Sequence, residues 1–492
     1  MGVTAGPTPE RDGSASAVAL EPLTLESHLD EMREHYPEEV VTIEDEVDID
    51  CGVTALFAQL ERERKFPIII VKRPVYKGRR HDFPVVTGLY ASRARLARLI
   101  GADPHMVGPE FAGRLRAPVA PVTLERADAS VKHTVVPERE IDLRTLPAPR
   151  HHPMDPGQYL SGGFLTTYSR SRGIENSAIQ RAWIKDTKEL RIYMNRPTHN
   201  YRNYEEYQAA NEPMPAAYWV GHHPLHVLGC ETRSRLDHWE AAGAVAQRPL
   251  RLVASETLGP DFLVPADAEF VIEGYVLPHE RRPEGPFGEY PMYYGPQHHN
   301  PVMIVTAITH RPAPVWDCIV VGHTHWLAAF QREGNAYDQV KRAVPQVTNV
   351  YLPRRSAGGC LHVYVQLKAT GSGQSRSALI AALSVDPLVK HAFVVDDDVD
   401  IFDDRDVLWA LATRFQADRD IITIPGMLAS GLDPSNQGRA LGCKAGFDCT
   451  RGVPEDRFAA KLELPDEYVT AQPIGAFVTA ETLAAIATDE LT

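Results

Sequence analysis

The sequence of 492 residues is poor in cysteine, in long apolar runs and in positive charge. Its six cysteines form no Cys-x-x-Cys pair, which argues against a disulfide framework and against a zinc ribbon. No apolar run approaches the roughly 18 residues that a membrane span needs, so we expect no membrane partner. A net charge of −14 opposes binding to a phosphate backbone, so we expect no nucleic acid partner.

Several catalytic signatures are absent as well. The glycines of "TGSGQS" lack the Lys-Ser/Thr of a P-loop and the Gly-x-Gly-x-x-Gly of a dinucleotide fold. The chain has neither a Gly-x-Ser-x-Gly elbow nor a nucleophilic cysteine signature. The N-terminus lacks the basic region and apolar core of a secretory signal. We therefore expect a disordered leader at residues 1–24 and a cytoplasmic protein.

What is present is an alternation of helix and strand patterns, which predicts an α/β (α+β) protein. We expect an N-terminal α/β domain over 25–125, where "FPIIIVKRP" is typical of a buried strand. Strands separated by Gly/Pro turns predict a split β-barrel or strongly bent sheet over 126–312, interrupted by a helix-and-loop insertion at about 204–245. We expect a second α/β domain over 313–465. Residues 466–492 predict an amphipathic helix that docks on the body or on a partner chain, with ordinary fraying as the alternative.

One stiff segment, "RRPEGPFGEYPMYYGP", contains two carboxylates, Glu284 and Glu289. Paired carboxylates suit general acid/base chemistry, because burial and mutual repulsion can separate their pKa values. A spacing of five residues makes them converge neither on a strand nor on a helix. The intervening Gly285, Pro286 and Gly288 bend the backbone, which allows both to face one cavity. On the pattern alone, a surface turn with two solvated glutamates is the favoured interpretation.

Other polar residues could complete such a site. Arg181 lies in the apolar strand "ENSAIQRAW", where an isolated charge is costly without a carboxylate partner, although an ordinary strand-edge arginine is the alternative. Asn176 and His199 belong to the same sheet region, and an Asn/His/Glu set suits a divalent cation that also takes phosphate oxygens. Their spacing alone is a weak signal.

The segment "PADAEFVIEGYVLPHERRPEGPFGEY" resembles the most characteristic segment of the UbiD-type decarboxylases, which use prenylated FMN to remove CO2 reversibly from unsaturated or aromatic acids. Other stretches resemble further motifs of that family in the same order: "DLRTLPAPRHHPMDPGQYL", "NSAIQR", "VKHAFVVDDDVDIFDDRDVLWALATR" and "KAGFDCTR". The resemblance covers about Leu25 to Arg451. It implies that the split β-barrel over 126–312 binds the cofactor.

The resemblance also implies roles for individual residues. Glu289 would be the catalytic acid/base, and Arg181 and Glu284 would complete its network. A Mn2+ (or Mg2+) ion that bridges to the flavin phosphate, with K+ nearby, would be bound by Asn176, His199 and Glu240, where Asp237 or His238 could replace Glu240. The lysine that contacts the phosphate would be Lys390. The other cofactor-binding positions would be Asn176, Ser177, Ile179, Gln180 and Arg181.

The function that follows is reversible, non-oxidative decarboxylation of an α,β-unsaturated or (hetero)aromatic acid through a covalent adduct with prenylated FMN. A flavin prenyltransferase would supply the cofactor, and a homodimer or higher homo-oligomer is expected. Two alternatives remain open here: a non-catalytic flavin-binding subunit of a decarboxylase complex, and a metal-dependent hydrolase. The segment "GHTHWLAAFQREG" is expected to line the substrate side through His323, His325, Trp326 and Phe330.

Overall fold

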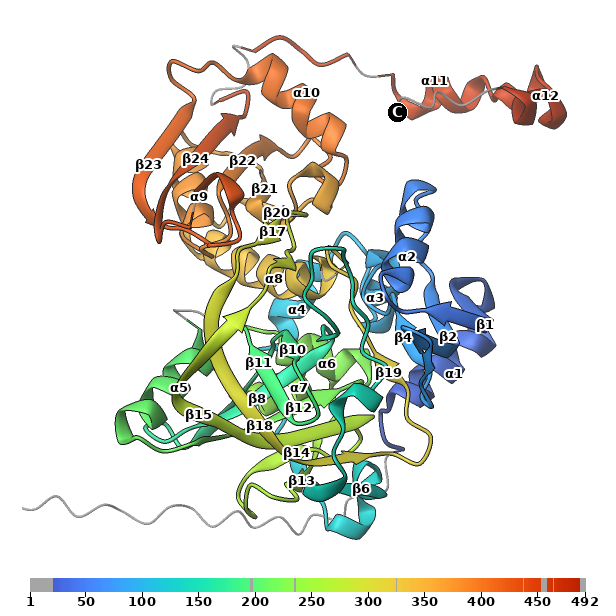
Figure 1. Cartoon of the computed structure of the whole chain (residues 1–492). Coiled ribbons are helices and arrows are strands. Elements are labelled where there is room, and N and C mark those ends of the chain that lie inside the picture. Colours follow the sequence, from blue (N-terminus) through green and yellow to red (C-terminus); the bar gives the residue numbers. More distant parts are fainter. Residues whose placement is uncertain are drawn as a thin grey trace, which may run out of the picture.

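The computed structural model describes the chain except for residues 1–20, 195–197, 234–235, 324, 437, 453–457, 463 and 487–492. Most of the expected leader therefore lies outside the described residues. Within the described residues, no helix combines the length and the apolar character that a membrane crossing demands. The fold has three parts, shown in blue, green to yellow, and orange in Figure 1.

The N-terminal part is a small α/β unit. Its sheet has the order β1 (Val40–Asp48), β2 (Ile68–Tyr76), β4 (Val85–Thr87) and β19 (Trp316–Asp317), with β3 (Arg79–Arg80) paired to β2. The apolar run of "FPIIIVKRP" forms β2, as predicted. The sheet is accompanied by four helices: α1 (Leu25–His35), α2 (Gly52–Arg62), α3 (Arg93–Leu99) and α4 (Val107–Arg114). β19 joins β4 in parallel, although more than 200 residues separate them in the chain.

The central part is a nine-stranded sheet that curls into a half-barrel (Figure 1). Its order is β7 (Tyr159–Leu160), β10 (Ala182–Ile184), β11 (Glu189–Ile192), β18 (His298–His310), β15 (Phe270–Glu284), β12 (Met214–Val220), β8 (Gly163–Ser169) and β9 (Ile174–Ile179), and β6 (Thr134–Pro137) pairs with β18. The long pair β15 and β18 carries two register shifts, which bend it. At one of them, a Cβ on Gly274 would lie 2.1 Å from the Ile304 carbonyl oxygen, so only glycine fits.

The expected helix-and-loop insertion at about 204–245 is wrong in one respect. It contains three helices, α5 (His199–Ala210), α6 (Pro224–Cys230) and α7 (His238–Ala246), but also the strand β12, which lies between β15 and β8 inside the sheet. All of β12 except Pro215 is buried, so the strand lacks the polar alternation that a half-exposed strand shows. Small strands complete this region: β5 (Val122–Thr123), β13 (Arg251–Ala254), β14 (Leu263–Pro265), β16 (Phe287–Gly288) and β17 (Tyr294–Gly295).

The C-terminal part is a second α/β unit. Its sheet has the order β20 (Val347–Tyr351), β21 (His362–Leu367), β22 (His391–Asp396), β24 (Leu441–Cys449) and β23 (Ile421–Leu428), and its helices are α8 (His325–Ala343), α9 (Gln374–Leu383) and α10 (Asp404–Arg414). α8 lies at the boundary with the other parts (Figure 1). There the buried Glu333 accepts two hydrogen bonds from Arg93 of α3, at 2.8 and 2.9 Å, which ties the first part to the third.

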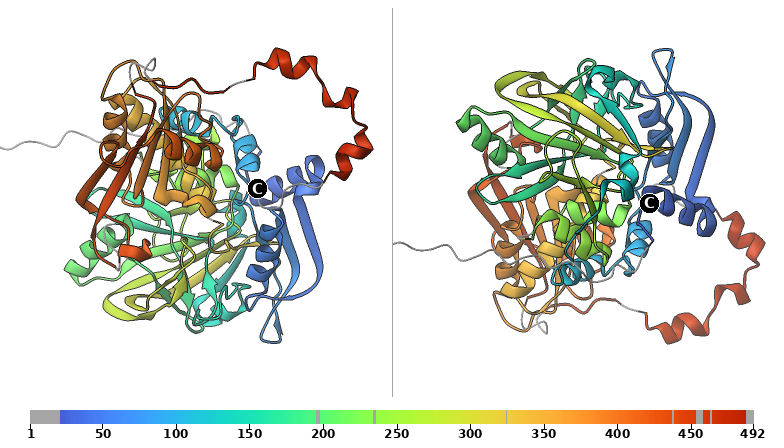
Figure 2. Two further views of the ribbon diagram at one scale, coloured as in Figure 1. Left: turned by 90° about the horizontal axis from the view of Figure 1, so that it is seen from above. Right: turned by 90° about the horizontal axis from the view of Figure 1, so that it is seen from below.

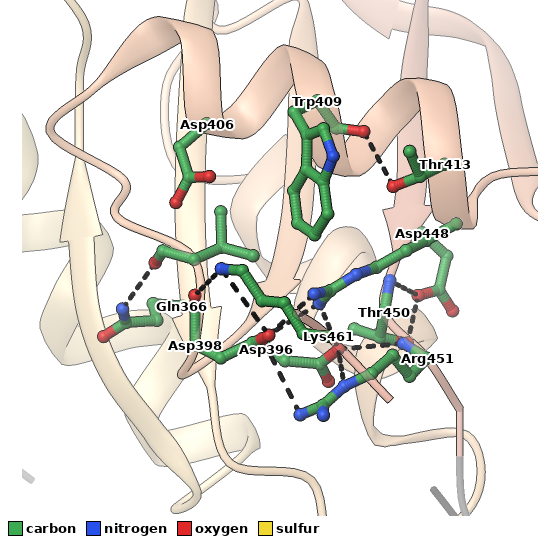
Figure 3. Close-up of polar contacts among 12 residues, drawn as sticks. Gln366, Asp396, Asp398, Asp406, Trp409, Thr413, Asp448, Thr450, Arg451 and Lys461 are labelled. Carbon is green, nitrogen blue, oxygen red and sulfur yellow. Dashed lines mark hydrogen bonds and ion pairs between the residues drawn. The ribbon is translucent and has the colours of Figure 1, made fainter. Parts of the chain in front are cut away.

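The acidic loop after β22 is neutralised by cationic side chains (Figure 3). Asp396 pairs with Arg414 (2.8 Å) and Arg451 (3.2 Å), and Asp398 pairs with Arg414 (2.7 Å). Lys461 donates to the Asp398 carbonyl oxygen (2.9 Å). This network fixes the chain that leaves the last strand.

Beyond Lys461 the chain forms an arm that projects from the body (Figures 1 and 2). The helical character expected at 466–492 appears, within the described residues, as two short helices, α11 (Asp466–Ala471) and α12 (Ala480–Ala485). Pro473, which has no backbone N–H to donate, lies between them and precedes a single 3-10 turn at Ile474–Ala476.

Candidate active site

Glu284 is the fully buried member of a pair of carboxylates. It is the last residue of β15, and its side chain is fully buried. Arg181 donates to its carboxylate through Nε (3.1 Å) and Nη2 (3.2 Å). Tyr159 donates through its hydroxyl (3.0 Å) and Asn300 through its amide (2.9 Å). These four donors satisfy both oxygens, so the carboxylate is fixed in place.

Glu289 is the partly exposed member of the same pair. The turn after β15 and the short strand β16 bring it back to Arg181, whose Nη1 pairs with the Glu289 carboxylate. The Glu289 side chain is 16% exposed, against 8% for Arg181 and none for Glu284. The two carboxylates therefore converge on one guanidinium, which excludes a solvated surface turn.

Burial and neighbouring charges act in opposite directions on Glu289 and on Arg181. Burial raises the pKa of Glu289, and the neighbouring Arg181 charge only partly opposes this effect. For Arg181, burial lowers the pKa, but Glu289 and then Glu284 outweigh burial and raise it. The guanidinium also lies over the rings of Tyr193 (4.0 Å) and Phe287 (4.8 Å), which restrict its position. The site thus holds a permanent cation beside a carboxyl group that takes up a proton more readily than usual.

The loop that carries Glu289 is anchored by Asp155. The backbone N–H of Gly288 donates to Asp155 Oδ1 (3.4 Å), and those of His151 (3.2 Å) and His152 (2.8 Å) donate to Oδ2. Sequence reasoning missed Asp155, Tyr159 and Asn300 as supports of the site. The first two lie in "DPGQYL", within a segment that the resemblance already covered, but nothing in the pattern indicated their partners.

A second polar group lies along β9. His199 Nδ1 and Asn176 Oδ1 are 3.1 Å apart, and Asn176 donates to Asn200 (2.6 Å). The pKa of His199 is lowered, first by burial and then by the charges of His238 and three arginines, Arg172, Arg202 and Arg233. A neutral imidazole beside an amide oxygen can bind a divalent cation, and the arginine charges suit a phosphate.

The remaining predicted ligand of that cation, Glu240, lies in the first turn of α7, which packs beside β9. The nearby His238 ring lies 6.5 Å from that of His199. The part of the chain that the structure describes holds no cluster of three or more His, Cys, Asp or Glu side chains placed to bind a metal. The set implied by the resemblance combines an asparagine oxygen with one histidine and one carboxylate, so it is not a cluster of that kind.

Three other predicted cofactor residues, Ser177, Gln180 and Ile179, have hydrogen-bond partners within the protein. Ser177, on the opposite face of β9 from Asn176, accepts from Trp219 (2.9 Å) and Thr166 (3.2 Å), so its hydroxyl is occupied. Gln180 donates to the Tyr193 carbonyl oxygen. The N–H of Ile179 donates to Glu231, a buried carboxyl group whose pKa burial raises to about 7 and which sequence reasoning missed.

Lys390 belongs to the C-terminal part. Its ammonium pairs with Asp433 (3.0 Å) and donates to Ser435 (2.5 Å), beside a cavity of about 250 Å³. The structure therefore brings Arg181, Glu284 and Glu289 together, and Asn176 with His199, whereas Lys390 is held by C-terminal partners.

The aromatic segment expected to line the substrate side contacts the N-terminal part. Trp326 and Phe330 each lie 5.2 Å from the guanidinium of Arg93, and His323 packs on Phe57 at 4.5 Å. These three rings lie at the boundary with the N-terminal part. His325 differs, since its Nδ1 lies 2.7 Å from the hydroxyl of Tyr290, the residue that follows Glu289.

Family models match the chain in order along its length. They describe the N-terminal domain of 3-octaprenyl-4-hydroxybenzoate carboxy-lyase at residues 33–115, the Rift-related domain at 122–324 and the C-terminal domain at 325–449. Together they cover well over half of the sequence. The chain belongs to the UbiD family of carboxy-lyases.

Individual relatives agree with this assignment. Gallate decarboxylase of Lactiplantibacillus plantarum is 34% identical over 382 residues, which cover 72% of this chain and 77% of that protein. Anhydromevalonate phosphate decarboxylase of Methanothermobacter thermautotrophicus is 29% identical over 419 residues, which cover 84% and 94%. The UbiD-class enzyme HmfF from Pelotomaculum thermopropionicum in complex with FMN matches with a TM-score of 0.84 and 31% identity, over 92% of this chain and 100% of that one. An evolved dimeric form of HmfF is in complex with prFMN.

The chain is therefore an enzyme that catalyses non-oxidative decarboxylation. A metal-dependent hydrolase and a non-catalytic flavin-binding subunit find no support in these comparisons. The α/β fold with a curled central sheet, expected from the sequence, is confirmed.

The raised pKa of Glu289 predicts a pH dependence of stability. The folded chain binds this proton more tightly than the unfolded chain, whose carboxyl has the ordinary value of 4.5. The resulting stabilisation is complete below pH 4.5 and is lost as the pH rises through the raised pKa. We expect the free energy of unfolding of the wild type, relative to Glu289→Gln, to fall by up to about 1.4 kcal/mol per pH unit in that window. Urea unfolding of both proteins at a series of pH values checks this, and a constant difference would contradict it.

Proposed function

We propose that this chain decarboxylates an aromatic carboxylic acid with prenylated FMN as cofactor and Glu289 as the acid/base. One observation carries the proposal: a single guanidinium, that of Arg181, is shared between a carboxylate closed off by four donors and one that is partly exposed. Such an arrangement holds a proton donor beside a fixed cation.

The roles of the three residues follow from their surroundings. Arg181 orients the substrate carboxylate or Glu289 through its charge, because its position is fixed by Glu284 and by two rings. When bound, the modified flavin supplies the electron sink that no side chain provides for the electron pair left as CO2 departs. Glu289, whose pKa burial raises, then delivers the proton to the carbon that lost CO2. Glu284 keeps the guanidinium in place throughout.

The cofactor would be held by β9 and the residues around it. Asn176, His199 and Glu240 supply an amide oxygen, a neutral imidazole and a carboxylate for Mn2+ or Mg2+, and K+ could accompany this ion. The arginine charges around His199 favour a flavin phosphate there. The Ser177 hydroxyl is bonded to Trp219 and the Ile179 N–H to Glu231, so these two residues would contribute through their remaining backbone groups. Lys390 would contact the phosphate only after release from Asp433.

For the substrate we commit to an aromatic acid. The gallate decarboxylase relative acts on a hydroxylated aromatic acid by its name, and it is 34% identical to this chain. Tyr290 follows Glu289 in the chain, and its hydroxyl lies 2.7 Å from His325 Nδ1. The two rings stack with their centroids 5.9 Å apart, and together they could hold a ring with polar substituents. The second candidate is a phosphorylated unsaturated acid, which the anhydromevalonate phosphate decarboxylase relative favours.

The acid/base role of Glu289 is tested by Glu289→Gln in protein produced together with a flavin prenyltransferase. We expect the variant to retain the modified-flavin absorbance and to lose CO2 release from a panel of hydroxylated benzoic acids by about 10²-fold or more, because amides do not transfer protons as carboxyl groups do. Glu280→Gln, on the outer part of β15, is the matched control and should keep full activity. Full activity of Glu289→Gln would refute the role. Wild-type protein that carries the modified flavin yet releases no CO2 from any acid would refute the proposed substrate class.

The metal set is tested separately by His199→Ala. Loss of one of three ligands should lower bound Mn2+, measured by plasma mass spectrometry, together with the flavin that copurifies. His105→Ala, at an exposed histidine, is the control. Unchanged metal and flavin contents in His199→Ala would overturn the assignment.

We also propose that the chain forms a homodimer or higher homo-oligomer through the arm beyond Lys461. The arm exposes large apolar side chains that a lone chain leaves in water: Leu462, Leu464, Tyr468, Val469, Ile474, Phe477 and Ile486. A chain that ends at Lys461 should therefore contain fewer copies per particle than the full chain, measured as the light-scattering mass divided by the mass of one chain. The same number of copies for both would exclude the arm as the contact.

A further inference from the structure

A cavity of about 240 Å³ lies on the side of the molecule where the N-terminal part meets the central sheet, and none of the roles assigned above involves it. Its walls come from four segments: α1, α3, the start of α6 and the end of α7. Leu23, Met32, Leu99 and Leu225 form its apolar lining. Its polar lining consists mainly of cations and imidazoles.

Two residues of this lining each have a buried polar atom without a hydrogen-bond partner. His28, from α1, is 2% exposed and its Nδ1 has no hydrogen-bond partner. Arg95, from α3, is also 2% exposed, and its Nε has none either. An unpartnered buried N–H costs free energy comparable to a lost hydrogen bond, so such atoms are normally satisfied by a water molecule or a ligand. Because the Arg95 Nε–H can only donate, its missing partner must be an acceptor.

The charge around the cavity has one dominant sign. Arg95, Arg98 and Arg248 line it, against the single carboxylate of Glu31. Glu39 pairs with Arg95 (3.0 Å) and Arg98 (2.6 Å), but Arg248 contributes a further exposed cation at the rim. Burial and the charges of Arg95 and Arg98 lower the pKa of His28 to about 4, so its imidazole is neutral at pH 7 and its nitrogens can accept or donate. A second imidazole, that of His223, lies 5.4 Å from His28.

From these observations we infer that the cavity binds a small organic anion, a carboxylate or a phosphate carried on an apolar body. The anionic oxygens would accept from Arg95 Nε–H and from His28, and Arg248, which Glu39 does not pair, would balance the charge. The apolar lining would take the rest of the molecule. Because the walls come from both parts of the fold, such a ligand would stabilise the boundary between them.

Helix α7 connects this cavity with the residues proposed to bind the metal. α7 ends at Ala246, which lines the cavity, and begins at His238, whose ring lies near His199. At nine residues, the helix is about 13 Å long. Its neighbour α6 is locked to it, because a Cβ on Gly229 would lie 2.4 Å from the Ala242 Cα. The inferred site and the proposed metal set are thus at opposite ends of one rigid element.

The experiment uses the full chain produced without the flavin prenyltransferase. Binding at this cavity is distinguished from binding at the proposed active site by the position of the density and by variants of residues that line the cavity. Inorganic phosphate and 4-bromobenzoate are titrated by calorimetry, and the bromine is located by anomalous diffraction. We expect saturable binding of at least one probe, with electron density beside His28 and Arg95. Arg248→Gln should weaken binding about tenfold, as loss of a charge-assisted contact does. Glu31→Gln should strengthen it about threefold, because it removes the one repelling carboxylate on the lining.

Arg33→Ala is the matched control, since Arg33 lies on α1 but pairs with Asp30 in solvent and does not line the cavity. It should leave the affinity unchanged. Density for an ordered water alone at His28 and Arg95, or no saturable binding of either probe up to tens of millimolar, would overturn the inference. Weaker binding by Glu31→Gln, or equal loss in Arg33→Ala and Arg248→Gln, would do so as well.

Discussion

The guanidinium of Arg181, shared between two carboxylates, is the interaction on which the rest of the structure depends. Its Nε and Nη2 serve Glu284, and its Nη1 serves Glu289. Glu284 is also held by a tyrosine and an asparagine from other strands, so several strands of one sheet must bring their residues to a single point. A flat sheet cannot do this. The register shifts that bend β15 and β18 are therefore part of how the site is built.

The turn after β15 brings Glu289 back to the Arg181 guanidinium. Glu289 must return to the same guanidinium within five residues, which neither a strand nor a helix achieves. Gly285, with a φ of 85°, lies in the left-handed region that favours glycine, and it starts the turn. Asp155 then fixes the turn from outside by accepting from Gly288 and from two further backbone N–H groups. The bend at Gly285 and the hydrogen bonds to Asp155 together orient the Glu289 carboxylate.

The sequence predicted the parts of this arrangement that depend on local pattern. The buried strand at Ile68–Tyr76, the bent turn between the glutamates and the three-part order of the chain all follow from composition and periodicity. The supports of Glu284 could not be predicted this way, because Tyr159 is 125 residues distant and its partner is chosen by the fold. β12 was missed because a strand buried on both faces shows no alternation. The resemblance implied the network of Arg181 with the two glutamates, but it did not indicate the tyrosine, asparagine and aspartate that support this network.

The difference between the two carboxylates follows from how the one cation is divided. Glu284 receives two of the three nitrogens of Arg181 and two neutral donors besides, so every oxygen is satisfied. Glu289 receives only the remaining nitrogen, and for this carboxyl the cost of burial outweighs the attraction and raises the pKa. If Glu289 were as fully bonded as Glu284, its charged form would be favoured and it would lose its use as a proton donor. The unequal division of one guanidinium therefore makes one carboxylate structural and leaves the other able to carry a proton.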